Sequence, residues 1–261
     1  MQTLCGGGGG FATSPHWESA HPESTGAKAA CPFADFGQVG GGRTRHMFIG
    51  HYAPAIAAAA RKDSPPAWIL FVAAQFVDIL FFLAVFPGWE RAPNDPAAPA
   101  ALPFALDAPW THSLLGSAGH AILFGALLSL AAPAGRKWAW GLISGLVVLS
   151  HWPIDWLVHR PDLPLAPGTE PLGLGLWYRP WIAWPLEIGL LAAATWWFAR
   201  AVPSRARAAW GLSAFMLLVQ VVSRTAFPPA ESITALAPTA LFAYALFPAL
   251  AAWALRKPAA G

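Results

Sequence analysis

Apolar residues gather in seven blocks along the chain, and short polar or proline-rich stretches separate the blocks. The blocks cover about residues 47–60, 66–88, 112–132, 138–158, 180–199, 208–226 and 236–255. All but the first are as long as the roughly 17 to 25 residues that an α-helix needs to cross a bilayer. The pattern predicts an all-α, polytopic membrane protein with six to seven transmembrane helices.

Composition supports this prediction and argues against one class of partner. Hydrophobic residues make up 56% of the 261 residues and charged residues only 11%, whereas soluble domains carry about a quarter charged residues. The net charge is +3, but the basic residues are scattered between the apolar blocks and form no cluster with aromatic residues. We expect the lipid bilayer, and not a nucleic acid, as the partner of this chain, and the oligomeric state stays open.

The N-terminal residues 1–45 differ from the rest of the chain. They are rich in Gly, Ser, Pro and Ala and contain no apolar segment like that of a signal peptide. We predict a disordered tail there and a helical membrane domain over residues 46–261. Cys5 and Cys31 both lie in this tail and form no CxxC pair, so they say little about the redox compartment. Met47 opens the first apolar block and is a candidate for the natural start of the protein.

The basic residues between the blocks predict an orientation in the membrane. If the blocks cross alternately, one side collects Arg61, Lys62, Arg136, Lys137, Arg200, Arg205, Arg207, Arg256 and Lys257. Because short loops rich in Lys and Arg stay in the cytoplasm, we predict that this side is cytoplasmic. The long proline-rich loops near residues 89–111 and 159–179 then lie on the outer side, where they can cap a site.

Ionisable residues inside the apolar blocks are the strongest functional signal. A charged side chain at the centre of a membrane helix costs about 2.5–3.5 kcal/mol on insertion scales, so Asp78, Asp155 and Glu187 need partners. In the predicted orientation these acids lie at a depth similar to that of four histidines: His51, His112, His151 and His159. We expect side chains from five blocks to face one another in the outer half of the membrane.

The stretch LSHWPIDWLVHR places His151, Asp155 and His159 at intervals of four. Residues i and i+4 share a helix face about 6 Å apart, so His151 and Asp155 can hold one ion, while His159 supports that site or binds a second ion. Pro153 predicts a kink that turns these side chains inward. Imidazole and carboxylate ligands without cysteine favour Zn, with Mn or Fe as the other options.

Single residues in this group also have simpler explanations. His112 can be an interfacial residue at the start of a helix, and Asp78 can stabilise a polar contact between helices. Glu187 can pair with Arg179 or Arg160 at the membrane interface. The similar depth of polar residues in several blocks favours a shared metal site over these separate explanations.

At these residues the chain resembles the YdjM-like membrane-bound metal-dependent hydrolases, an all-helical bacterial inner-membrane family. The similar stretches, between about residues 47 and 200, are FIGHYAPA, AAQFVDIL, WTHSLLGS, LSHWPIDWLVHRPDLPL and LGLGLW. The THS and HxxxD elements of the family correspond to Thr111, His112 and Ser113, and to His151 and Asp155. The resemblance implies a bacterial inner-membrane location and a metal site within residues 46–200. The chain departs from the family at DAPW, where a His-Arg pair often precedes THS.

These observations lead us to expect a metal-dependent hydrolase that acts on a phosphoester or ester, such as a lipid-linked one, at the outer leaflet. The predicted metal ligands are His51, Asp78, His112, His151 and Asp155. The candidate general base is Glu187 or His159, because a partly buried carboxylate or imidazole can titrate near neutrality.

Three other functions stay open. The stretch SAGH, from Ser117 to His120, together with HxxxD suggests a lipid-phosphate phosphatase, but the expected phosphate-binding Arg and Lys are absent before His151. Packing in the core is the simpler explanation for His120. A proton-coupled transporter or proton relay would use the same acids and histidines and would need a polar path to the cytoplasmic side. A non-catalytic membrane protein would use the metal only to hold helices together.

Overall fold

The computed structural model describes residues 49–98, 102–226 and 230–257, and these residues are mostly helical. The predicted disordered tail, residues 1–45 with Cys5 and Cys31, lies outside the described residues, and so does Met47. The all-α prediction is confirmed for the described part, where the only strands form one short hairpin.

The helices follow the apolar blocks closely. The described α-helices are α1 (Ala53–Ala59), α2 (Ala67–Ala74), α3 (Phe76–Val85), α4 (Leu114–Ala131), α5 (Lys137–Leu149), α6 (His151–Val158), α7 (Pro180–Ala201), α8 (Ala206–Thr225) and α9 (Ile233–Ala254). Short 3-10 helices are η1 (Ile49–Tyr52), η2 (Leu176–Tyr178) and η3 (Pro203–Arg205). Strands β1 (Leu163–Pro164) and β2 (Pro171–Leu172) pair antiparallel, with Leu163 opposite Leu172.

Two helices, α4 and α9, begin with a capping serine. The Ser113 side chain accepts a hydrogen bond from the backbone N–H of Gly116 at the start of α4, and Ser232 accepts one from Ala235 at the start of α9. Helix α7 begins with Pro180, whose fixed φ suits the first helical position.

By length and composition, five helices among the described residues can cross a membrane. One of them joins α5 and α6, and a sixth is obtained if α2 and α3, which are bent by 52°, form one span. The sequence block at residues 66–88, expected as one helix, is therefore broken at Gln75. The first block forms only η1 and α1, so it is short, as expected.

Near the kink predicted at Pro153, the structure shows a break in the helix just before the proline. The helical stretch is interrupted at Ser150, between α5 and α6, and Pro153 lies in the first turn of α6. The reason is local, because a proline has no N–H to donate and its ring disturbs the turn that precedes it.

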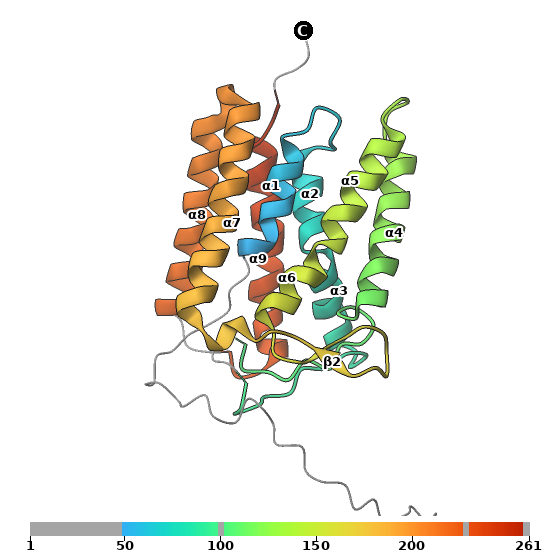
Figure 1. Cartoon of the computed structure of the whole chain (residues 1–261), viewed down its shortest axis with the longest axis vertical. Coiled ribbons are helices and arrows are strands. Elements are labelled where there is room, and N and C mark those ends of the chain that lie inside the picture. Colours follow the sequence, from blue (N-terminus) through green and yellow to red (C-terminus); the bar gives the residue numbers. More distant parts are fainter. Residues whose placement is uncertain (1–48, 99–101, 227–229, 258–261) are drawn as a thin grey trace, which may run out of the picture. The chain divides into compact units, whose positions relative to one another are not determined.

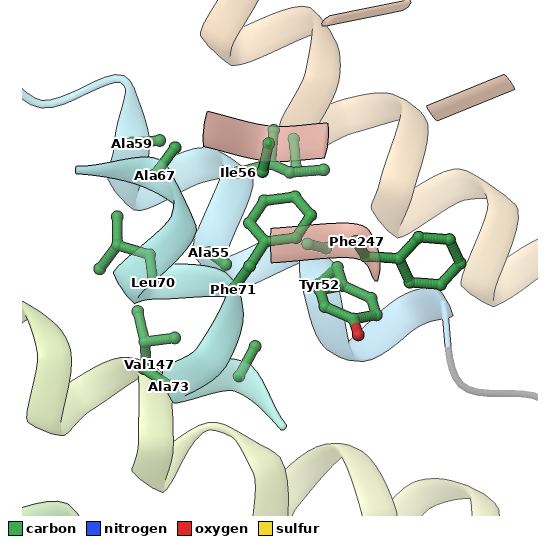
Figure 2. Packing of buried hydrophobic residues seen from close by; sticks show 14 of the residues in the cluster. Tyr52, Ala55, Ile56, Ala59, Ala67, Leu70, Phe71, Ala73, Val147 and Phe247 are labelled. Carbon is green, nitrogen blue, oxygen red and sulfur yellow. The ribbon is translucent and has the colours of Figure 1, made fainter. Parts of the chain in front are cut away.

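The short η1–α1 element lies inside the bundle, and all four residues of η1 are buried. In Figure 2, Tyr52 and Ile56 from this element meet Phe71 of α2 and Phe247 of α9. The Tyr52 ring lies 4.9 Å from that of Phe71 and 5.5 Å from that of Phe247. The N–H of Ile49 donates to Gln220 Oε1 of α8 at 3.3 Å. Contacts with the surrounding helices thus hold in place an element that is too short to span a bilayer.

The loops with basic residues predicted to share one side gather at one end of the bundle, drawn at the top of Figure 1. They join α1 to α2, α4 to α5 and α7 to α8, and Lys257, shortly after α9, lies there as well. Contacts tie three of them together. Lys257 donates to the Arg61 carbonyl and, at 2.7 Å, to Ser64 Oγ, and Arg136 lies 4.0 Å from Asp63.

The two long proline-rich loops meet at the opposite end. Arg160 Nη1 lies 2.6 Å from Asp95 Oδ2, and the Tyr178 hydroxyl donates to the Ala97 carbonyl at 3.0 Å. The backbone N–H of Ala97 and the Arg160 guanidinium together hold the pKa of Asp95 below its ordinary value. These contacts join the loop after α3 to the loop after α6.

Candidate metal centre

The five residues predicted to bind metal come together at one point of the fold. His51 comes from η1, Asp78 from α3, His112 from the turn before α4, and both His151 and Asp155 from α6. His51 Nε2 lies 2.8 Å from Asp155 Oδ1, and His151 Nε2 lies 3.1 Å from Asp155 Oδ2. Asp78 Oδ1 lies 3.2 Å from His112 Nε2 and 3.4 Å from His151 Nε2. Only Asp78 is partly open, with 17% of its side chain exposed.

The break between α2 and α3 orients His151. The Ala74 carbonyl at this break lies 2.9 Å from His151 Nδ1, and a carbonyl only accepts, so Nδ1 carries the proton. The other ring nitrogen, Nε2, then presents its lone pair toward Asp155 and Asp78. Nε2 is buried and makes no hydrogen bond among the described residues. This is how metal-binding histidines are commonly held in proteins.

A second relay orients His112. The Thr111 hydroxyl donates to Glu90 Oε2 at 2.6 Å, so its oxygen accepts from His112 Nδ1, 2.8 Å away. His112 Nε2 is left to face Asp78. Two histidines of the cluster are therefore fixed in the tautomer that can bind a cation.

Glu90, an acid of the predicted outer loop after α3, was missed by the sequence analysis as a residue of the site. It is 2% exposed and also accepts the backbone N–H groups of Trp110 and Thr111, at 2.9 and 2.8 Å. No sequence signal separates it from the neighbouring loop acids, because its burial depends on how residues 89–113 fold back.

Tyr244 was also missed, because the last two blocks resembled the family only in hydrophobicity. Its hydroxyl donates to Asp78 Oδ2 at 2.8 Å. A tyrosine in the middle of an apolar block is a usable signal, since the chain has only three tyrosines. Helix α9 therefore supports the cluster, although all the predicted ligands lie within residues 46–200.

The two candidate bases occupy different positions. His159 Nε2 lies 3.6 Å from Asp155 Oδ1, and its Nδ1 lies 3.1 Å from Asp162 Oδ1. Burial alone would lower the pKa of His159, but the negative charges of Asp155 and Asp162 outweigh it and raise this pKa. Glu187 is buried on α7 and accepts from Gln220 Nε2 at 3.4 Å, next to Gly50 of η1. Of the two, His159 reaches the cavity described next.

The cluster forms the polar floor of a cavity of about 810 Å³. His51, Asp78, His112, Asp155 and His159 all line this cavity, and most of its walls are apolar side chains. Leu102, Pro103 and Leu106 of the loop after α3, with Trp177 of η2, close it at one end. The long loops thus cap the site, as the sequence analysis expected.

The donor set fits a divalent cation. Two groups of three residues could each hold an ion, because within each group the ligand atoms all lie within 4.8 Å of one another. The first group is His51, His151 and Asp155, and the second is Asp78, His112 and His151. Because Nδ1 of His151 is engaged by the Ala74 carbonyl, this histidine offers one ligand atom and can serve only one ion. Among the described residues, the ion pairs of Asp78 and Asp155 involve histidines alone. Two buried carboxylates need positive charge close by, from a metal ion or from protonated imidazole.

His120 and Arg160 have contacts outside the cluster. The half-buried ring of His120 packs edge-on against Phe76 at 6.2 Å and does not line the cavity, so His120 lies outside the cluster. Arg160 pairs with Asp95 and Asp162.

Comparison with known proteins finds no matching family model, no matching curated protein and no matching solved structure.

Proposed function

We propose that this protein is a membrane-bound metal-dependent hydrolase acting on a phosphoester or ester. One observation carries the proposal. Three imidazoles and two carboxylates converge at the floor of an apolar cavity, which all of them except the buried His151 line, and the ion pairs of those carboxylates involve histidines alone among the described residues. The resemblance to YdjM-like hydrolases in the THS and HxxxD elements agrees with it. Zn is the proposed ion, with Mn or Fe as the other options.

We also propose that the chain is a polytopic protein of the bacterial inner membrane. Five helices that can cross a membrane, and a bent pair that makes a sixth, support this placement. The basic loops at one end favour a cytoplasmic location for that end. The cluster would then lie in the outer half of the membrane, beneath the capping loops near residues 89–111 and 159–179.

The residues of the site have distinct roles in this proposal. A bound divalent ion would acidify a water molecule and polarise the substrate oxygen. His159 is the proposed general base, because it lines the cavity and is paired with Asp162. Thr111 and the Ala74 carbonyl hold the tautomers of His112 and His151. Glu187 supports the η1 backbone that carries His51.

The transporter and proton-relay alternatives receive less support. A transport path would have to continue from the cluster to the basic end of the bundle. That direction is filled by the apolar core around Ile56, Leu70 and Phe71 (Figure 2). The lipid-phosphate phosphatase alternative loses His120, which packs against Phe76, and Ser117, whose hydroxyl donates to the Thr111 carbonyl.

Metal content tests the proposal directly. We expect near-stoichiometric metal in detergent-purified protein by elemental analysis, and loss of that metal in His151→Ala and Asp155→Ala. His120→Ala is the matched control, because it removes a histidine outside the cluster and should keep the metal. Metal-bound protein should then hydrolyse an aryl phosphate or aryl ester, and metal without turnover would support a structural ion instead. Metal-free protein after growth in metal-supplemented medium would favour the proton relay.

A further inference from the structure

The cavity above the metal cluster has two unlike parts. Its floor carries the imidazoles and carboxylates, whereas its walls away from the floor come mainly from Phe81 and Phe82 of α3 and from the facing sides of α8 and α9. A small polar substrate would need only the floor. The apolar part therefore requires a separate explanation.

The wall formed by α8 and α9 is open to the outside. Leu218 and Val222 of α8 line the cavity and are 57% and 40% exposed. Phe242 of α9 also lines the cavity and is 67% exposed. Because the exposed fractions of these three lining side chains are large, we place them at the rim of an opening between the two helices.

The packing of the two helices explains why they leave an opening. Helix α8 packs mainly on α7, whereas α9 packs mainly on α2, and the two contact each other much less. Both belong to the helices that can cross a membrane. In the proposed membrane placement, the opening faces hydrocarbon and not water.

The rim is apolar, and this decides the class of occupant. A polar molecule entering between two membrane helices would lose its hydration without finding partners at Leu218, Val222 or Phe242. A hydrocarbon chain that moves from the lipid into the cavity meets walls that are equally apolar. Only the polar head group of such an amphiphile needs polar partners, and the floor of the cavity supplies them. The cavity volume of about 810 Å³ lies in the range of about 300–1,000 Å³ of sites for drug-sized ligands. That size suits one hydrocarbon chain with a small head group.

We infer that the cavity binds a single-chain amphiphile, which enters sideways from the membrane between α8 and α9 and presents its head group to the metal cluster. The inference rests on the proposed function only for the phosphoester or ester chemistry of that head group. The position of the chain follows from the cavity itself.

Photolabelling tests the inference without relying on turnover. The probes are hexadecyl phosphate and methyl hexadecanoate, each with a diazirine in the alkyl chain, added to the full-length protein in phosphatidylcholine nanodiscs. We expect labelling of cavity-facing residues on α8 and α9. An excess of the unlabelled amphiphile whose head group gives the stronger labelling should reduce this labelling at least tenfold. Non-saturable labelling spread over lipid-facing residues such as Leu127 of α4 would overturn the inference.

Blocking variants test the route. Val222→Trp and Thr239→Trp place a large ring at the rim and should reduce saturable labelling at least tenfold. Leu127→Trp, a substitution of an exposed apolar residue away from the cavity, should leave labelling unchanged. If Leu102→Trp in the capping loop abolishes labelling while both rim variants keep it, entry is from the loop end and the lateral route is wrong. Saturable labelling in protein that binds no metal would support the cavity and refute the hydrolase.

Discussion

Replacing Glu90 by glutamine should weaken metal binding without removing a ligand. In the native protein the Thr111 hydroxyl gives its proton to Glu90, so it accepts the Nδ1 proton of His112. A glutamine in the same place can keep an oxygen on the Trp110 and Thr111 backbone N–H groups, and its NH₂ group then donates to the Thr111 hydroxyl. That hydroxyl must turn its proton toward His112 Nδ1. The His112 proton moves to Nε2, the atom that faces Asp78, and blocks it as a ligand.

The size of the effect follows from the role of Glu90. Partners that orient metal-binding histidines typically change metal affinity by about 10–100-fold when they are mutated, which corresponds to about 1.4–2.8 kcal/mol. We expect Glu90→Gln to fall in this range and to keep its fold, because the substitution preserves shape and both backbone contacts. Thr111→Val should have a similar effect for a different reason, since it removes the acceptor of the His112 Nδ1–H and the donor to Glu90 Oε2.

Competition with a chromogenic chelator, on protein in detergent, measures the affinity. Glu170→Gln is the control, because this acid is exposed in the loop between β1 and β2. An affinity for Zn within twofold of the wild type in Glu90→Gln, with an unchanged melting temperature, would refute the tautomer argument. It would show that His112 is not a ligand or that Glu90 does not orient it.

Three further results follow from other contacts. Tyr244→Phe removes the hydroxyl that donates to the α3 carboxylate and should lower metal affinity about tenfold or more in the same chelator assay. Gly125→Ala puts a methyl group 2.7 Å from a carbonyl oxygen of α5 and should destabilise the protein by about 1–3 kcal/mol in thermal unfolding, whereas Gly189→Ala, in open space, should be neutral. The Ala97 backbone N–H and the Arg160 guanidinium lower the pKa of Asp95 in the folded protein, so these contacts stabilise the fold above the ordinary pKa near 4, and this stabilisation is lost as the pH falls. The melting temperature of the wild type should therefore drop more steeply below about pH 5 than that of Asp95→Asn.

The five residues of the cluster could be predicted because ionisable residues are rare in apolar blocks. His151 and Asp155 share a helix face by spacing alone. His51, Asp78 and His112 could be added because similar depth in several helices leaves few other partners for a buried carboxylate. The geometry brings all five together, and whether they bind an ion stays a prediction until metal is measured.

Other features depended on information that periodicity does not carry. Hydropathy is uniformly high on both sides of Gln75, so the bend between α2 and α3 was invisible, and with it the Ala74 carbonyl that orients His151. Glu90 lies in a loop whose fold is set by distant contacts. In both cases, backbone or loop geometry orients a histidine that could itself be predicted from the sequence.

The buried position of η1 has a consequence for the order in which the protein matures. His51 is synthesised before every helix that holds it in place, since Ile49 bonds to Gln220 of α8 and Tyr52 packs on Phe247 of α9. The short element cannot cross the bilayer alone, so it must wait for the C-terminal helices to arrive. A nascent chain released before α8 and α9 would thus have every predicted ligand and still lack an assembled site.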